Sequence, residues 1–173
     1  MTVDTVEARR VHWDDPATAP LKAELTHEYV SRYGDGAREE LTRYDAALFA
    51  PPDGTLLLLL VDGRAVAGGA FKRRDAHTAE LKRIWTRSGH RRQGLGRRVV
   101  AELERAAVEL GYRRIYLTTG PKQPEAKGLY LATGYTPLFD VTADPLTIGL
   151  LAFEKHLERS EGAYLPAHRR NSA

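Results

Sequence analysis

The sequence predicts one α/β domain built on a mixed, mostly antiparallel sheet with helices on both faces. Residues 55–86 contain three strand-like segments joined by tight turns, which is typical of an antiparallel meander. Residues 95–119 contain a long amphipathic helix followed by a strand, and such a unit joins parallel strands through a right-handed crossover. The chain has 173 residues and no long linker, so we expect one domain over 1–173, with 158–173 as a loosely ordered polar tail.

The first 50 residues predict one strand and two helices. Residues 5–13 alternate in part and favour a strand. Pro16 suits a first helical position, and apolar residues then recur at helical spacing until Gly34. Residues 38–49 place their apolar side chains on one helical face, so a second helix is expected before the Pro51–Gly54 break.

The central strands have the clearest signals. Residues 55–61 form a continuous apolar run, which is typical of a strand buried on both faces. Asp62 and Gly63 suit a hairpin turn into a return strand over 65–73. Residues 78–86 alternate and predict the third strand of the meander.

The C-terminal half predicts two helices and three strands. From Leu95 to Leu110, apolar residues recur at steps of three and four, and Gly111 is a natural helix end. The remaining expected elements are a strand over 114–119, a helix from Pro124 to Gly134, and two closing strands over 135–141 and 150–157.

The net charge of +3 is unevenly distributed. Seven basic residues and no acid lie between Leu81 and Ala101, whereas the other 152 residues carry 19 basic and 23 acidic side chains. This favours one localised anion site over a generally basic nucleic-acid-binding surface. The chain has no Cys, and its six His lack metal-ligand spacing, so we expect neither a thiolate nucleophile nor a metal site.

The sequence shows no pattern typical of a membrane span or a signal peptide. The longest apolar run, residues 56–61, is far shorter than the roughly 20 residues that span a bilayer. The N-terminus lacks the basic-then-apolar form of a signal peptide. We therefore expect a cytoplasmic protein without membrane contact.

The segment Arg91-Arg92-Gln93-Gly94-Leu95-Gly96 has the properties of a phosphate-binding loop. Its glycines allow the backbone to approach a ligand, and the helix that follows presents free N–H groups at its start. Arg91, Arg92 and Arg97 add full positive charges. The Rossmann pattern fails because Val99 occupies the place of its third glycine, and the Walker G-K-[ST] is absent.

Two motifs resemble those of the GNAT N-acetyltransferase superfamily. Arg91-x-x-Gly94-x-Gly96, preceded by the strand at 81–86, is similar to the family pattern Q/R-x-x-G-x-G/A. Residues 123–135, QPEAKGLYLATGY, are similar to the family element N-x-x-A-x-x-L-Y-x-x-x-G-F/Y. The resemblance is specific over residues 80–137 and implies the GNAT-like acyl-CoA N-acyltransferase fold.

The resemblance implies acetyl-CoA as the cosubstrate and an amine as the acceptor, either a small molecule or a protein amino group. It assigns the pyrophosphate to residues 91–97. It assigns the pantetheine arm to the exposed backbone of Ile84, Trp85 and Thr86, where an unpaired N–H could also stabilise an oxyanion. Gln123 stands where the family usually has an Asn that contacts the same arm.

The resemblance also suggests catalytic residues. Tyr130 matches the tyrosine that protonates the departing thiolate, with a packing role as the alternative. Glu80 begins a strand at the place where relatives often carry the base that deprotonates the amine, with a surface pair to Lys82 as the alternative. Further candidates are Glu28, Asp75 and His77 for the base, and Tyr29 and Tyr33 for the acceptor pocket.

Three functions are therefore considered. The first is direct acetyl transfer to an amine in a ternary complex, which the absence of Cys fits. The second is a non-catalytic coenzyme A-binding sensor or regulatory module. Nucleic-acid binding ranks last, because Trp85 is the only stacking aromatic within the basic stretch. Homodimers are common in the family, and the apolar residues 150–153 could pair across such an interface.

Overall fold

The computed structural model describes residues 5–158, and within this part of the chain seven strands form one sheet. The strand order is β1-β2-β3-β4-β5-β7-β6. The strands are β1 (Val6–Arg10), β2 (Thr55–Val61), β3 (Arg64–Arg73), β4 (Thr78–Thr86), β5 (Arg114–Thr119), β6 (Thr136–Pro137) and β7 (Leu151–His156). The α-helices are α1 (Ala19–Tyr33), α2 (Leu95–Glu109), α3 (Pro124–Ala132) and α4 (Pro145–Ile148). Short 3-10 segments are η1 (Pro16–Thr18), η2 (Asp35–Leu41), η3 (Ala46–Phe49) and η4 (Ser88–His90).

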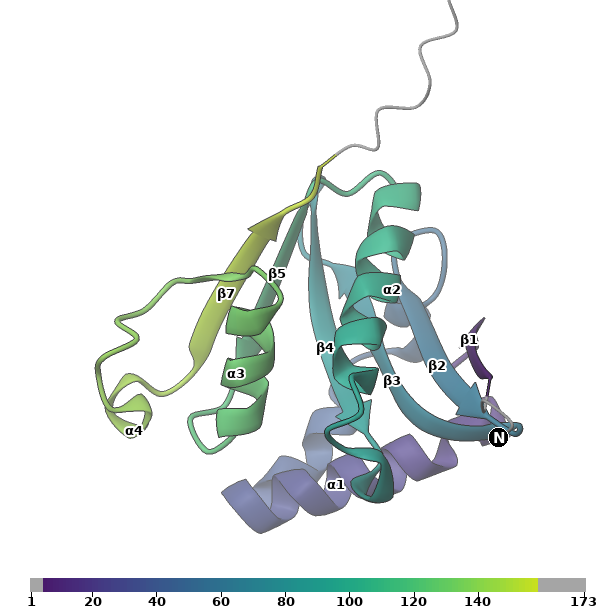
Figure 1. Ribbon diagram of the computed structural model, residues 1–173, viewed down its shortest axis with the longest axis horizontal. Coiled ribbons are helices and arrows are strands. Elements are labelled where there is room, and N and C mark those ends of the chain that lie inside the picture. Colours follow the sequence, from purple (N-terminus) through teal and green to yellow (C-terminus); the bar gives the residue numbers. More distant parts are fainter. Residues whose placement is uncertain (1–4, 159–173) are drawn as a thin grey trace, which may run out of the picture.

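Helices cover both faces of the sheet. Figure 1 shows α2 and α3 on one face, while α1 crosses the strands at one end of the molecule. Strand β2 lies between these layers: Leu57 and Leu59 pack in the cluster beneath α2, and Leu58 and Leu60 pack with α1. The prediction of a strand buried on both faces is therefore confirmed.

Strands β4 and β5 form the only parallel pair among the described strands, and they stay together for only a short distance. Their ladder joins Thr78–Glu80 to Arg114–Tyr116 and then stops. Figure 1 shows the two strands separating toward the end of the molecule where α1 lies. The crossover through α2 forces the parallel pairing, and the split leaves the β5-facing edge of β4 without ladder partners beyond Glu80.

The expected helix over 38–49 is wrong. This segment instead contains η2 and η3, separated by a turn. Short polar side chains compete there for the backbone groups that an α-helix would use. Thr42 Oγ1 donates to the Glu39 carbonyl (3.1 Å), and the Asp45 carboxylate accepts the Ala47 N–H (2.9 Å).

The expected strand over 135–141 is much shorter than predicted, because only Thr136 and Pro137 pair with β7. Pro137 has no N–H to donate to a ladder, and Asp140 turns the chain by accepting the Thr142 N–H at 2.9 Å. The short helix α4 was not predicted, although Asp144 and Pro145 form a usable start signal: the Asp144 side chain caps the Leu146 N–H.

Strand β7 pairs on both sides within the chain, with β5 and with β6. Phe153 is fully buried and pairs with Pro137, whereas Leu150 lies just before β7 and is 68% exposed, so the pairing of residues 150–153 across a dimer interface stays a prediction. None of the helices in the described residues combines the length and apolar character needed to cross a bilayer. The predicted polar tail lies outside the described residues, except for its first residue, Glu158.

Candidate active site

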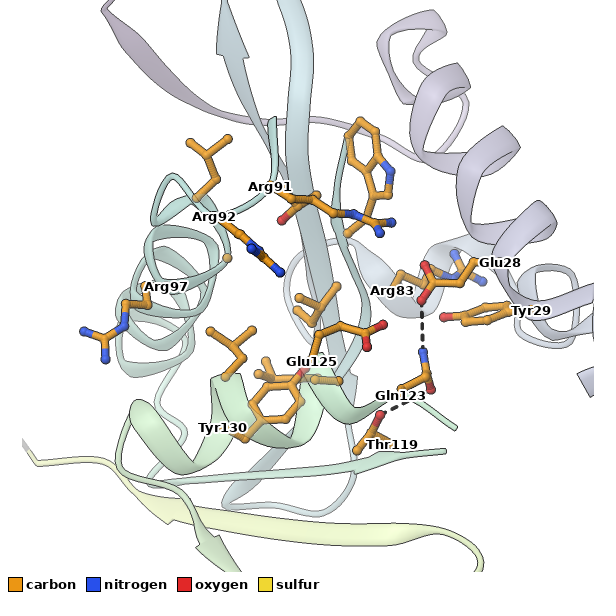
Figure 2. A pocket seen from close by; sticks show the side chains of 18 of the residues that line it. Glu28, Tyr29, Arg83, Arg91, Arg92, Arg97, Thr119, Gln123, Glu125 and Tyr130 are labelled. Atoms are coloured by element: carbon orange, nitrogen blue, oxygen red, sulfur yellow. Dashed lines mark hydrogen bonds between the residues drawn. The ribbon is translucent and has the colours of Figure 1, made fainter. Parts of the chain in front are cut away.

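A cavity of about 600 Å³ lies where β4 and β5 separate. Residues from α1, β4, the loop before α2, β5 and α3 line it (Figure 2). On one side lie the glycine-containing loop and the start of α2, and on the other lie side chains of α1. The cavity therefore connects the two faces of the sheet through the gap between the strands.

Helix α1 is held over this gap by contacts with the end of β4. The Glu24 carboxylate accepts the indole N–H of Trp85 at 3.2 Å and the backbone N–H of Ser88 at 3.1 Å. These bonds place the next turn of α1, which carries Glu28 and Tyr29, at the cavity.

The glycine loop has the conformation that its sequence predicts. Gly94 has φ +76 and precedes the first residue of α2, and a Cβ built on it would meet no atom within 4 Å. The helix starts without a side-chain cap, so its first N–H groups remain available to a ligand. Gly96 packs closely, because an added Cβ would lie 3.4 Å from Leu129 Cδ2.

The cations of this loop do not all face the cavity in the same way. Arg91, Arg92 and Arg97 belong to the lining, whereas Gln93 does not. Figure 2 shows the Arg97 guanidinium turned away from the other labelled residues, and its Nη2 donates to the Ala132 carbonyl at 3.2 Å. Arg91 and Arg92 therefore remain the better placed pair for a phosphate.

A β-bulge shapes β4 beside the cavity. The β3–β4 register shifts between Gly68 and Ala70, and Arg83 has φ +61, a left-handed conformation that is uncommon for a residue with a side chain. Ile84 consequently packs toward α2 over Gly69, where an added Cβ would lie 2.6 Å from Ile84 Cδ1. The predicted residues Ile84, Trp85 and Thr86 all line the cavity, and their strand edge faces the gap.

Tyr130 lies in the wall formed by α3. Its ring packs against Tyr135 and Phe153 at centroid distances of 5.5 and 5.6 Å, and only 4% of the residue is exposed. Figure 2 shows its hydroxyl directed toward the middle of the cavity. Burial raises the pKa of the Tyr130 phenol above its ordinary value, so the hydroxyl keeps its proton at neutral pH.

Glu80 does not line the cavity. It is buried on the face of the sheet that carries Tyr44, and its carboxylate lies 3.3 Å from Lys82, 3.4 Å from Lys72 and 3.6 Å from Arg74. The expected pairing with Lys82 is present, and two further cations share the same carboxylate.

Glu28 is the carboxylate that α1 brings to the cavity. Its Oε1 accepts a hydrogen bond from Gln123 Nε2 at 3.5 Å, and Arg32 lies 3.4 Å away (Figure 2). Gln123 is fixed in turn, because its Oε1 accepts from Thr119 Oγ1 at 3.2 Å and from the Gly120 N–H at 3.0 Å. This network joins α1, β5 and α3 across the cavity.

Other candidates occupy different positions. Tyr29 lines the cavity, whereas Tyr33, Asp75 and His77 do not. Tyr33 instead accepts the Lys122 N–H at 3.2 Å. The sequence did not single out Arg32 and Glu125, which form an ion pair at the cavity; the i, i+4 spacing of Glu28 and Arg32 was the available signal.

A comparison of the sequence with protein families identifies one family. The model of the acetyltransferase (GNAT) family matches residues 19–135, which include the cavity wall from α1 to Tyr130. The chain belongs to the GNAT family. The uncharacterized N-acetyltransferase YsnE of Bacillus subtilis (strain 168) is 31% identical over 93 residues, which are 50% of this chain and 62% of YsnE. The matched segment thus spans less than two thirds of that relative.

Solved GNAT structures share the fold over almost their whole length. A GNAT acetyltransferase from Staphylococcus aureus Mu50 has a TM-score of 0.68 and 14% identity, covering 89% of this chain and 100% of its own. PaiA from Thermoplasma acidophilum, in complex with coenzyme A, has a TM-score of 0.68 and 16% identity, covering 88% and 99%. YncA from Salmonella typhimurium, with its cofactor acetyl-CoA, has a TM-score of 0.67 and 14% identity, covering 93% and 99%. At these identities the likeness concerns the fold.

Proposed function

We propose that this GNAT protein transfers the acetyl group of acetyl-CoA to a primary amine by direct attack in a ternary complex. The observation that carries the proposal is a cavity that runs through the gap between β4 and β5, with a cationic glycine loop at one side and a buried phenol inside. The family match and the complexes of PaiA and YncA support the choice of donor.

The residues present fit a coenzyme A thioester. Gly94 leaves open space above the start of α2, and Arg91 and Arg92 supply positive charge for the pyrophosphate. The unpaired edge of β4 from Ile84 to Thr86 can hydrogen-bond the pantetheine amides. The thioester supplies an activated acetyl carbon, and the following roles are those of the chain itself.

Three groups of the chain perform the transfer. Glu28 accepts a proton from the ammonium form of the acceptor, so that the free amine can attack the acetyl carbon. A backbone N–H of β4 stabilises the negative charge that develops on the acetyl oxygen. Tyr130, whose hydroxyl points into the cavity, donates its proton to the departing sulfur. Glu80, the base expected from the sequence, would reach the amine only through water.

Tyr130→Phe tests the proposal. We expect kcat for acetyl transfer to fall about 100-fold, because general-acid catalysis contributes on this scale, while the dissociation constant of acetyl-CoA stays unchanged. Release of free thiol with a panel of amines measures the rate, and calorimetry measures binding.

Tyr135→Phe is the matched control, since Tyr135 packs against Tyr130 but donates its hydroxyl to Glu104 at 3.0 Å and does not line the cavity. Equal rates for the two variants would contradict the acid role of Tyr130. A wild-type protein that binds acetyl-CoA but acetylates no amine in the panel would favour the coenzyme A-binding sensor instead.

A further inference from the structure

A basic cluster lies on the face of the sheet that α1 covers, just beyond the cavity. We call this face the acceptor face, because it carries Glu28 and Tyr29 at the cavity. It consists of Lys72, Arg74 and Lys82, which converge on the carboxylate of Glu80 within 3.3 to 3.6 Å. Three cations thus share one anion, which leaves an excess of two positive charges. Other carboxylates of this region have their contacts elsewhere: Glu154 pairs with Arg114, Glu40 pairs with Arg43 and also favours the charged form of Arg83, and Asp45 and Asp75 accept backbone N–H groups.

Two of the three cations are largely shielded from water, whereas the Arg74 side chain is 42% exposed. The Lys72 and Lys82 side chains are only 16% and 19% exposed, and both ammonium groups lie over the ring of Tyr44, at 5.0 and 5.2 Å. Arg74 stacks on Tyr116 at 3.7 Å. Aromatic faces attract cations but carry no formal charge, so they do not neutralise the excess. Partly buried cations that outnumber their counter-ions are costly, and an incoming anion would relieve that cost.

Arg83 adds an independent observation on the same face. The bulge turns its side chain toward Phe49 at 4.1 Å, whose ring lies 6.4 Å from that of Tyr44. Arg83 is 6% exposed, its Nη2 donates to the Leu41 carbonyl at 2.9 Å, and its buried Nη1 has no partner in the described part of the chain. Burial lowers the pKa of Arg83 to about 10, so the side chain is still positively charged at neutral pH.

The cluster continues the acceptor side of the cavity. Thr118 lines the cavity, and Tyr116 is the next residue of β5 on the same face, about 7 Å further along the strand. Tyr116 pairs with Glu80 at the point where β4 and β5 separate. Arg83 lines the cavity and is adjacent in β4 to Lys82. An acceptor whose amine lies in the cavity therefore extends its other end over the cluster.

We propose that the acceptor is an amine that also carries an anionic group, a carboxylate or a phosphate monoester, which Lys72, Arg74 and Lys82 bind. This inference rests on the proposed acetyl transfer and names the substrate class of the same site. The amine lies beside Glu28, and the anion lies near Tyr116, the next residue after Thr118 on the same face of β5. Opposite charges at the two ends of the acceptor thus match opposite charges at the two ends of its binding surface.

Matched amines test the proposal. We expect 5-aminovalerate and 3-aminopropyl phosphate to have kcat/KM values about tenfold or more above those of pentylamine and 1,5-diaminopentane, mainly through a lower KM. Comparing the two anionic amines identifies whether carboxylate or phosphate is preferred. Lys82→Met should raise KM for the anionic amines about tenfold and leave kcat within about twofold.

Arg105→Met is the control of equal charge change, because Arg105 pairs with Glu102 on the exposed side of α2. Pentylamine reacting as well as 5-aminovalerate, or equal KM values in the two variants, would overturn the anionic acceptor while leaving acetyl transfer in place.

A second readout needs no turnover: 5-acetamidovalerate is titrated into each variant with coenzyme A present. If 5-acetamidovalerate binds more weakly to Lys82→Met but not to Arg105→Met, the cluster is supported even if no amine reacts. A lack of reaction with every amine would count only against acetyl transfer. Equal binding in both variants overturns the cluster.

Discussion

At the scale of single residues, two carboxylates compete for the role of base. Glu28 lines the cavity and is held by Gln123 and Arg32. Glu80 lies outside the lining, and three cations surround it. A base must come within hydrogen-bond reach of the proton that it removes, directly or through one water, so geometry favours Glu28.

We expect Glu28→Gln to lower kcat about 100-fold at neutral pH, because the amide keeps the bond geometry but cannot accept the proton. The loss should shrink at high pH, where more of the acceptor is already a free amine. Glu80→Gln should leave kcat nearly unchanged. A pH–rate profile of each variant measures this, and a larger loss of kcat in Glu80→Gln would return the base role to Glu80.

At the scale of elements, the start of α2 and the loop before it form the proposed anion site. Gly94 provides the left-handed turn, and the uncapped helix start provides N–H groups. Gly111 lies just after the other end of the same helix, also in a left-handed conformation, with φ +93, and without atoms within 4 Å of an added Cβ. The two glycines therefore differ mainly in their distance from the cavity.

Gly94→Ala should raise the dissociation constant of acetyl-CoA at least about tenfold, because a Cβ would occupy the space that a phosphate needs. Gly111→Ala is the matched control, since both changes impose a cost of about 1 kcal/mol for the left-handed backbone. Calorimetric titration with acetyl-CoA measures binding, and urea unfolding measures stability. Similar dissociation constants in the two variants would rule out the loop as the phosphate site.

At the scale of the whole molecule, two glycines of β3 allow the helical layers on the two faces to pack closely against the sheet. Gly68 faces Leu58 and Leu21 of the α1 side, and Gly69 faces Ile84, Val99 and Leu103 of the α2 side. Side chains at these places would separate the layers from the sheet. The bulge in β4, which shapes the cavity, depends on the same close packing.

Gly69→Ala should lower the free energy of unfolding by about 1–3 kcal/mol, because its Cβ would lie 2.6 Å from Ile84 Cδ1 and 3.1 Å from Leu103 and Val99. The double variant Gly69→Ala/Ile84→Val should recover part of the loss, since it removes Cδ1. Gly89→Ala, where no atom lies within 4 Å, is the control. Urea denaturation measures all three, and a Gly69→Ala protein as stable as the Gly89→Ala protein would contradict the packing.

Elements with strong local signals could be predicted from the sequence alone. The apolar run of β2, the stripe of α2 and the prolines and glycines at element ends identified most strands and helices, because these patterns reflect burial and capping within one segment. The two motifs likewise singled out the glycine loop and Tyr130, which both contribute to the lining of the cavity. Residues 38–49 and 135–141 were mispredicted, since side-chain bonds to the backbone and a proline overrode the hydrophobic pattern.

The construction of the cavity walls follows from contacts between distant parts of the chain. The bulge at Arg83 and the end of the β4–β5 ladder at Glu80 depend on pairing with other strands, which local sequence does not encode. The gap between β4 and β5 opens the cavity, and the bonds of Glu24 bring Glu28 to it, whereas Glu80 lies in the basic cluster beside it. The two carboxylates are 52 positions apart in the sequence. The charge that the sequence showed as one cationic stretch is therefore divided in space: Arg91 and Arg92 line the cavity beside the start of α2, whereas Lys82 and Arg83 lie against the rings of Tyr44 and Phe49 on the other face of the sheet.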